Sequence, residues 1–315
     1  MNTLRRYYET LRWLRPRQVR ARVGLRLRRA TDPLCFPRRL ARAIRREGAP
    51  PDFAPHVRDG RLGGVAARPA LDPEAILAGE FRYANVTRRF PDAPDWLCPD
   101  PAQRFWYYNL HYFEYGPALA HAWRDTGNRA YLERLEALLR SWLDANPPGP
   151  TFAWDGGPLS HRIIHWCDTA FVLSGEFSDR AIARAFKDSL YTQALYLEDH
   201  LEYHLGGNHL LANGVALLHA GAAFAGRAAA RWRDRGLRIL LEELEEQILD
   251  DGGHYERSPM YHAIVLDQCL RAMRLVRAAE IPEPPLLRHK IVAMARFPGN
   301  VRAPDGTFLG VDGRP

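Results

Sequence analysis

The chain has 315 residues, 46% hydrophobic and 26% charged, with a net charge of +7, which is typical of a folded globular protein and excludes a disordered or collagen-like one. A transmembrane helix is excluded because no apolar run reaches about eighteen residues, and the charged N-terminus lacks the apolar core of a secretory signal. The four cysteines form no CxxC pair, so we expect no disulfide scaffold and a cytoplasmic location, with a membrane-associated or periplasmic one as the alternative.

The positive charge is concentrated in a leader. Residues 1–46 hold fifteen arginines and two acidic residues, a balance of +13, which leaves −6 for residues 47–315. Apolar residues recur at helical spacing over 4–14 and 19–27, on either side of Pro16, and predict two short basic amphipathic helices.

These helices could lie on an anionic membrane surface or attract a polyanion such as an acidic polysaccharide. Alternatively, they pack on the main domain through their apolar side. No helix-turn-helix, zinc-finger or RNP-like pattern is present, so we expect no specific recognition of nucleic acid.

The rest of the chain is predicted to be mainly helical. Residues 47–104 are rich in proline and glycine and predict an irregular connector with short strands around 81–90. From Phe105 onward the apolar spacing is helical with short connections, which predicts antiparallel helices in an α/α toroid or an irregular bundle. Residues 299–315 carry two Asp-Gly turns around 307–311, the expected start of a β domain. The expected helices span 105–124, 128–145, 158–174, 178–204, 208–226, 229–249, 258–279 and 284–297.

Two polar, glycine-rich stretches are the main candidates for chemistry. In GGNHLLANG, residues 206–214, paired glycines precede Asn208 and His209, although Asn208 could simply be the N-cap of the following helix. In DGGHYERSPMYH, residues 251–262, a Ser-Pro helix start presents Tyr261 on the first turn, where the alternative is a core tyrosine.

The predicted helical hairpin brings these two stretches together. The helices over 208–226 and 229–249 have similar lengths, about 30 Å at ~1.5 Å per residue, so the second stretch returns beside the first. Amide, imidazole, phenol and guanidinium groups that converge in this way are suited to a sugar-processing cleft, and a core would not collect them. The residues expected to gather there are Asn208, His209, His254, Glu256, Arg257 and Tyr261.

A third stretch, residues 152–168, places His161 and His165 four residues apart. This spacing can bind zinc, but position 162 is arginine instead of the glutamate of an HExxH site, so we expect neither a metal nor a cofactor.

Aromatic residues supply candidate faces for stacking on sugar rings. They are Trp154 and the run FWYYNLHYFEY over residues 105–115, which contains Tyr112. Most of this run could equally form part of the core.

In that order, NLHYFEY, GGNHLLANG and DGGHYERSPMYH resemble the motifs of heparinase II/III-type polysaccharide lyases. The arginine-rich leader is similar to that of members often associated with bacterial surface-polysaccharide loci. The resemblance covers nearly the whole chain. It implies an incomplete α/α toroid over residues 105–298, followed by the beginning of a β-sandwich over 299–315, with the substrate cleft between the two domains.

The resemblance further implies β-elimination on a uronic-acid-containing polysaccharide. In the family an asparagine neutralises the uronate carboxylate so that the C5 proton can leave, and Asn208 matches it. Tyr261 matches the tyrosine that protonates the leaving O4, and His209 matches a histidine that neutralises charge or takes the proton. The expected substrate-binding residues are Trp154, His254, Glu256, Arg257, His262 and Tyr112.

The family takes a further catalytic histidine from its β-sandwich, so the resemblance implies a missing or separate β-sandwich domain as a partner. Two other functions remain open at this point. One is a non-catalytic polysaccharide-binding module of a surface-polysaccharide assembly. The other is an α/α-toroid glycoside hydrolase that uses two carboxylates, with candidates Glu114, Asp155, Asp199 and Glu256.

Overall fold

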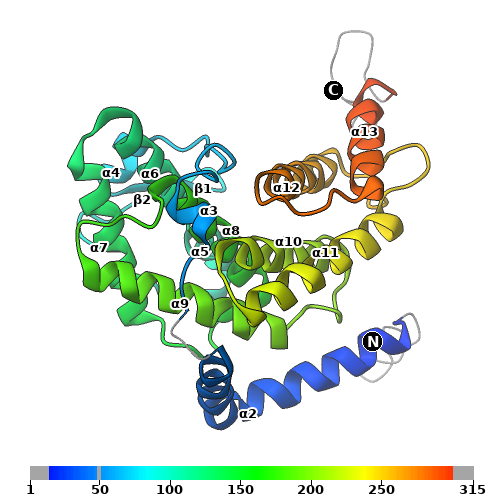
Figure 1. The fold of residues 1–315 in the computed structure, drawn as a ribbon, viewed down its shortest axis with the longest axis horizontal. Helices are drawn as coiled ribbons and strands as arrows, with labels where there is room; N and C mark the ends of the chain where they lie inside the picture. Colours follow the sequence, from blue (N-terminus) through cyan, green and yellow to red (C-terminus); the bar gives the residue numbers. More distant parts are fainter. Residues whose placement is uncertain (1–13, 48–50, 301–315) are drawn as a thin grey trace.

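The computed structural model describes residues 14–47 and 51–300 and shows an array of helices joined by short connections (Figure 1). Neighbouring helices form hairpins, and the array is the incomplete α/α toroid that the resemblance implied. The all-α prediction is therefore confirmed.

The N-terminal elements are α2 (Pro16–Glu47), α3 (Pro55–Arg58), α4 (Pro73–Leu77), β1 (Glu80–Tyr83), β2 (Val86–Arg89) and η1 (Pro101–Gln103). The helices of the array are α5 (Arg104–Tyr112), α6 (Tyr115–Thr126), α7 (Arg129–Ala145), η2 (Phe152–Trp154), α8 (Gly156–Leu173), α9 (Arg180–Asp199), α10 (Gly207–Ala223), α11 (Arg227–Gln247), α12 (Pro259–Ala278) and α13 (Pro285–Asn300).

Helices α8 and α10 form the centre of the molecule. Nearly every residue of α8, and every residue of α10 from Leu210 onward, is buried, although both helices also carry buried polar side chains, such as Arg162 and Asn213. Helices α7, α9 and α11 are amphipathic and alternate buried and exposed residues. Helix α10 packs against α8, α9, α11 and α12, so it is the element on which most of the array is assembled.

The contact between α10 and α11 is unusually close because it is made at glycines. A Cβ atom on Gly236 of α11 would lie 2.5 Å from the Gly214 carbonyl oxygen and 2.6 Å from the Leu218 nitrogen, both on α10. Gly221 of α10 would meet the backbone nitrogen of Arg233 at 2.5 Å. Real Cβ atoms do not approach backbone this closely, so the two helices can touch only where side chains are absent.

Of the expected helices, one is divided and another ends well before the sequence pattern indicates. The helix expected over 105–124 is divided into α5 and α6 at Phe113, which has a φ of 63°. The Phe113 ring is buried against Trp166, so core packing favours this left-handed conformation over continued helix. The helix expected over 178–204 ends at Asp199, because the Glu202 backbone N–H donates to Asn213 on α10 at 2.7 Å.

The strands expected around 81–90 are present as a hairpin. Strands β1 and β2 pair antiparallel, and Tyr83 lies opposite Val86. The two turn residues, Ala84 and Asn85, have φ values of 49° and 60°, the left-handed pair of a type I′ turn.

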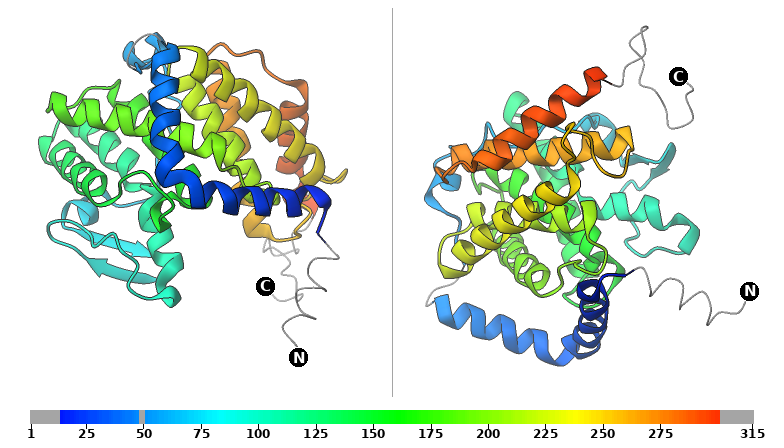
Figure 2. Two further views of the ribbon diagram at one scale, coloured as in Figure 1. Left: turned by 90° about the horizontal axis from the view of Figure 1, so that it is seen from below. Right: turned by 90° about the vertical axis from the view of Figure 1, so that its right-hand side faces the viewer.

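The leader differs from the two short helices expected. Helix α2 begins at Pro16, a favoured first helical position, and continues past Pro33 and Pro37 to Glu47. It bends sharply, and we call residues 16–32 its first arm and 33–47 its second arm (Figure 2). Internal prolines remove backbone hydrogen bonds and so account for the bend. The helix expected over 4–14 and the strand expected at 307–311 lie outside the described residues.

Polar groups fix α2 to the rest of the protein. The buried Asp32 carboxylate accepts hydrogen bonds from His200 Nε2 at 2.6 Å and from the Tyr196 hydroxyl at 3.0 Å. Glu47 accepts the free backbone N–H groups of residues 227 and 228, both at 2.8 Å, and its charge is favourable at the N-terminus of α11. In the second arm Phe36 packs edge-on against Tyr196.

The alternative that the leader packs through its apolar side is correct only for the second arm. In the first arm Val23 is 55% exposed and Leu27 is 64% exposed, while Arg29 faces the body and pairs with Asp155 at 2.8 Å. No helix in the described part of the chain is both long and apolar enough to cross a bilayer.

We predict that Gly236→Ala destabilises the protein by about 1–3 kcal/mol, because the added methyl group must push α10 and α11 apart. Urea unfolding measures this change. Gly24→Ala is the matched control, since a Cβ on Gly24 of α2 meets nothing within 4 Å and should stabilise the helix by ~0.5–1 kcal/mol. Equal stability of the Gly236→Ala and wild-type proteins would contradict the close-contact interpretation.

Candidate functional site

The first candidate stretch forms the start of α10. Gly206 and Gly207 have φ values of 69° and 59°, a conformation that glycine adopts without strain. Gly206 is the N-cap, so the alternative that Asn208 caps the helix is wrong. Asn208 is instead the second residue of α10 and partly exposed, and His209 follows it with its side chain half exposed. Both side chains stand at the positive end of a helix dipole.

The second candidate stretch leaves α11 through a tight turn. Leu249 N–H donates to the Gly253 carbonyl at 2.9 Å, and Tyr255 N–H donates to the Gln247 carbonyl at 2.9 Å. Ser258 then caps α12 by accepting the Tyr261 backbone N–H. Tyr261 is thereby placed on the first turn of α12, where it is partly exposed.

The two stretches meet at Gly207. A Cβ atom on Gly207 would lie 2.7 Å from the Tyr255 hydroxyl and 3.6 Å from a carboxylate oxygen of Glu256. This contact confirms that the α10–α11 hairpin returns the second stretch beside the first. Glu256 and Arg257 are both exposed, which leaves their charged groups free to contact a ligand at this end of the array.

A buried carboxylate that sequence reasoning missed supports the start of α10. Glu202 is 7% exposed, and one of its carboxylate oxygens lies 3.7 Å from His209 Nδ1 and accepts from Asn213 Nδ2 at 3.1 Å. The Glu202 carboxylate, with Glu256 further away, raises the pKa of His209 despite partial burial. Burial alone would raise the pKa of Glu202, but His209 and Asn213 outweigh it and the pKa is lowered. His209 is therefore held toward its cationic form.

Tyr112 and the third stretch lie next to this pair. The Tyr112 ring stacks on His161 with centroids 4.4 Å apart, and His165 Nδ1 donates to the Tyr112 carbonyl at 2.8 Å. Burial, together with the charge of Glu202, raises the pKa of Tyr112 to about 12. Burial, Arg271 and His209 lower the pKa of His161 to about 4. Tyr112 and His161 are thus neutral groups beside a charged His209–Glu202 pair.

Three residues expected to contact substrate lie in the interior, and those expectations are corrected. Trp154 is 2% exposed, and its ring packs edge-on against Tyr196, so it offers no face to a sugar. His254 donates to the Gln247 side chain at 3.0 Å. His262 donates to a backbone carbonyl of α13 at 3.0 Å. Both imidazoles are buried, His254 against α11 and His262, on α12, against α13.

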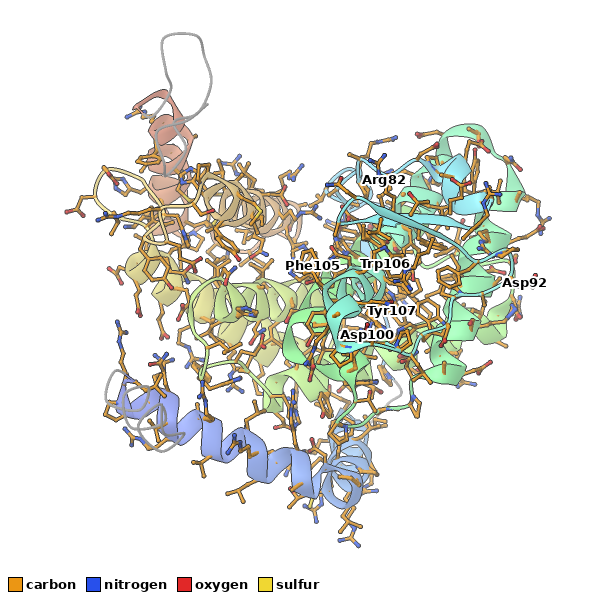
Figure 3. The ribbon with its side chains drawn as sticks, turned by 180° about the vertical axis from the view of Figure 1, so that it is seen from behind. Arg82, Asp92, Asp100, Phe105, Trp106 and Tyr107 are labelled. Carbon is orange, nitrogen blue, oxygen red and sulfur yellow. The ribbon has the colours of Figure 1, made fainter. Side chains whose placement is uncertain are left out.

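Most of the aromatic run over residues 105–115 belongs to the core, which was the alternative to stacking on sugar rings. At the start of α5, Trp106 and Tyr107 are buried and Phe105 is 64% exposed (Figure 3). The Arg88 guanidinium covers the Trp106 ring at 4.6 Å and donates to the Tyr107 hydroxyl at 3.2 Å. These rings therefore stabilise the junction between the hairpin and the toroid.

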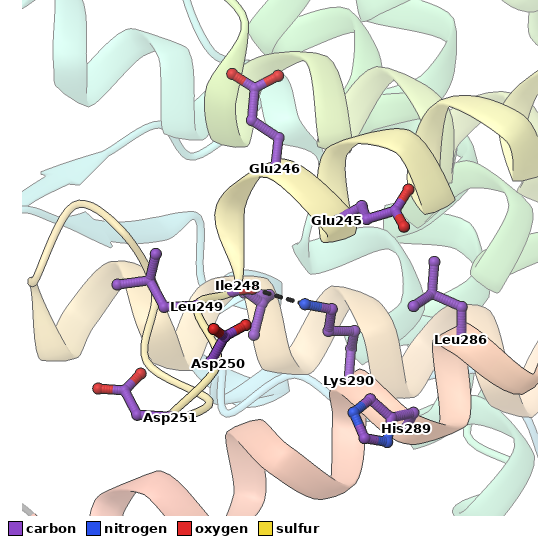
Figure 4. Close-up of a pocket in the computed structure, with 9 residues that line it drawn as sticks. All are labelled: Glu245, Glu246, Ile248, Leu249, Asp250, Asp251, Leu286, His289 and Lys290. Atoms are coloured by element: carbon purple, nitrogen blue, oxygen red, sulfur yellow. Dashed lines mark hydrogen bonds between the residues drawn. The ribbon is translucent and has the colours of Figure 1, made fainter.

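A hollow of about 710 Å³ lies between the end of α11 and α13 (Figure 4). It is not the candidate site, because Asn208, His209 and Tyr261 do not line it. Its four carboxylates would repel an acidic polysaccharide, and Lys290 already donates to the Ile248 carbonyl at 2.7 Å. The lining residues are Glu245, Glu246, Ile248, Leu249, Asp250, Asp251, Leu286, His289 and Lys290.

Comparison with known proteins agrees with the fold and the motifs. Residues 70–308 match the family model described as Heparinase II/III N-terminus. Because this match covers well over half of the chain, the protein belongs to that family.

Several relatives are similar over part of their length. A heparin-sulfate lyase of Pedobacter heparinus is 31% identical over 173 residues, which is 52% of this chain and 26% of that protein. FtsZ-localized protein C of Caulobacter vibrioides is 27% identical over 265 residues, 75% of this chain and 44% of that protein. The crystal structure of heparan sulfate lyase HepC from Pedobacter heparinus superposes with a TM-score of 0.61 at 21% identity, covering 80% of this chain and 44% of that one. The chain thus spans between about a quarter and a half of the length of these relatives.

We predict that Glu202→Gln lowers the pKa of His209 toward ~6.5, because the partner that favours the imidazolium loses its charge. The wild-type pair should stabilise the fold most between about pH 4.3 and 6.5. Its contribution is lost above this window as His209 deprotonates and below it as Glu202 is protonated. The His209 imidazole signal is the one missing from the NMR spectrum of His209→Gln. Titration of this signal in the wild-type and Glu202→Gln proteins measures the change in pKa. Glu256→Gln, the control, should lower the pKa less, and an unchanged pKa in Glu202→Gln would contradict the pairing.

Proposed function

We propose that this chain is the toroid part of a polysaccharide lyase that cleaves a uronic-acid-containing polysaccharide by β-elimination. The single observation that supports the proposal is the contact of the two motif stretches at Gly207, because Gly207 directly precedes Asn208 and Tyr255 lies in the segment that leads to Tyr261. Membership of the heparinase II/III family and similarity to heparin-sulfate lyases support the same reaction class.

The start of α10 is suited to receiving the uronate carboxylate. Backbone N–H groups at a helix N-terminus attract anions, and Asn208 adds an amide donor at the second helical position. His209 is held toward its cationic form by Glu202, so we assign it to charge neutralisation in preference to proton abstraction. With the carboxylate neutralised, the C5 proton becomes acidic enough to be removed.

Tyr261 is the proposed general acid. The proposed base that takes the C5 proton is the imidazole of the further histidine that the resemblance assigns to a β-sandwich domain. As the C5–H bond breaks, its electron pair forms the C4–C5 double bond and the C4–O4 bond breaks. The leaving O4 then takes the phenolic proton of Tyr261. The hydroxyl is suited to this role because it lies on a partly exposed first helical turn, fixed by the Ser258 cap.

We predict that Tyr261→Phe reduces turnover by roughly 10²–10⁴-fold, because general acid catalysis is lost while the ring remains. Substrate affinity should survive this change. Asn208→Ala should weaken both affinity and turnover, since the carboxylate loses its partner before and during the reaction. The assay is release of the unsaturated uronate, which absorbs near ~230 nm, from heparan sulfate and other uronic-acid polysaccharides.

Tyr255→Phe is the matched control, because Tyr255 lies in the same stretch and contacts Gly207 through its hydroxyl. Collapse of turnover in Tyr255→Phe but not in Tyr261→Phe would transfer the acid role to Tyr255. Reducing ends without absorbance at this wavelength would identify a hydrolase. Tight binding without any product would identify a binding module.

A further inference from the structure

The first arm of α2 has a polar side that faces the body. Arg15, immediately before the helix, pairs with Glu246 at 2.7 Å, and Arg29 pairs with Asp155 at 2.8 Å. Arg17 lies over the Tyr203 ring at 4.4 Å. Arg15 and Arg29 are about four helical turns apart at 3.6 residues per turn, so their two ion pairs lie on the same side of the arm, at its two ends.

The opposite side of the first arm is apolar and exposed. Leu27 precedes Arg29 by two residues, which is about 200° around a helix. Val23 lies one turn before Leu27 on the same side. Val23 and Leu27 are 55% and 64% exposed, and Leu34, just past the bend, is 74% exposed. Val23 and Leu27 of the arm are therefore directed away from the protein.

Arginines that are not used in binding the body flank this apolar side. Helix α2 contains eleven arginines against two acidic residues, Asp32 and Glu47. Arg20, Arg26 and Arg38 are exposed, and the ion pairs that α2 forms with described acidic residues use other arginines. A strongly cationic helix with an apolar outer stripe has the composition of an interfacial helix.

We propose that the first arm of α2, together with the start of the second arm, binds the surface of an anionic membrane, with Val23 and Leu27 inserted between lipid headgroups and Arg20, Arg26 and Arg38 contacting lipid phosphates. In Figure 1 and in the right-hand view of Figure 2 the helix runs along the lower edge of the molecule, an arrangement in which the arm can lie flat on a membrane. The proposal does not depend on the proposed lyase activity. It concerns residues that precede the family match, which begins at residue 70.

Two other occupants are less suited to this surface. A soluble acidic polysaccharide would be attracted by the arginines but would gain little from exposed valine and leucine. A second copy of the helix would bring eleven further arginines against the first set and be repelled. A lipid surface satisfies both the charge and the apolar stripe.

Vesicle co-sedimentation tests the proposal. The full chain should bind vesicles of phosphatidylcholine with about one-third phosphatidylglycerol, and should bind pure phosphatidylcholine at least tenfold more weakly. The triple variant Arg20→Gln, Arg26→Gln, Arg38→Gln should lose roughly a hundredfold in partitioning, since each arginine near an anionic surface contributes about fivefold. Its control is Arg124→Gln, Arg184→Gln, Arg238→Gln, which removes three exposed arginines of the body and should change partitioning less than twofold.

The double variant Val23→Ser, Leu27→Ser tests insertion and should reduce partitioning about tenfold, because apolar burial is lost while the charge is kept. Its control is Leu97→Ser, Val292→Ser, at two apolar residues of the body that are 73% and 42% exposed.

A fluorescent probe reports where the membrane is contacted. Cys35 is exposed beside Leu34, whereas Cys167 and Cys269 are buried, so a Cys98→Ser protein can be labelled at Cys35 with an environment-sensitive dye. We expect a blue shift on anionic vesicles. An unshifted dye, or vesicle binding equal to wild type in both α2 variants, would overturn the proposal. The proposal would also be overturned if the full chain bound no vesicles but bound heparan sulfate, and if the arginine variant bound heparan sulfate more weakly. That result would identify a polyanion-binding arm.

Discussion

The backbone contact between α10 and α11 is the constraint on which the candidate site depends. Gly214, Gly221 and Gly236 carry no Cβ, so the two helices approach more closely than any larger residue would allow. Because the helices have similar lengths and run antiparallel, close packing along the hairpin fixes the distance between its open ends. The polar groups at the start of α10 and after α11 are held together by packing that lies entirely outside the site.

A second level of organisation comes from one buried carboxylate. Glu202 lies in the connection before α10, and Asn213 binds both its side chain and its backbone N–H. Gly156 at the start of α8 leaves space for the Glu202 side chain, so three separate segments are needed to place a single negative charge next to His209. A buried carboxylate is costly unless it is paired, and this pairing determines which protonation state of His209 is favoured.

The leader shows how one amphipathic pattern can face in two directions. Its second arm buries Phe36 against the core, and its first arm faces the body with arginines and leaves Val23 and Leu27 in solvent. The buried Asp32 network lies at the junction of the two arms. It ties the helix to α9 and so determines which side of the first arm faces outward.

The sequence by itself determined the helical hairpins, the short strands around 81–90, and the meeting of the two glycine-rich stretches. Hydrophobic periodicity and glycine or proline positions are local properties, and helix length gives the reach of a hairpin. Only the tertiary structure decided that Trp154, His254 and His262 are buried, that Phe113 divides a helix, and that Glu202 supports His209. Those outcomes depend on atoms contributed by segments distant in sequence, and no spacing along the chain records which neighbour will cover a side chain or pair with a charge.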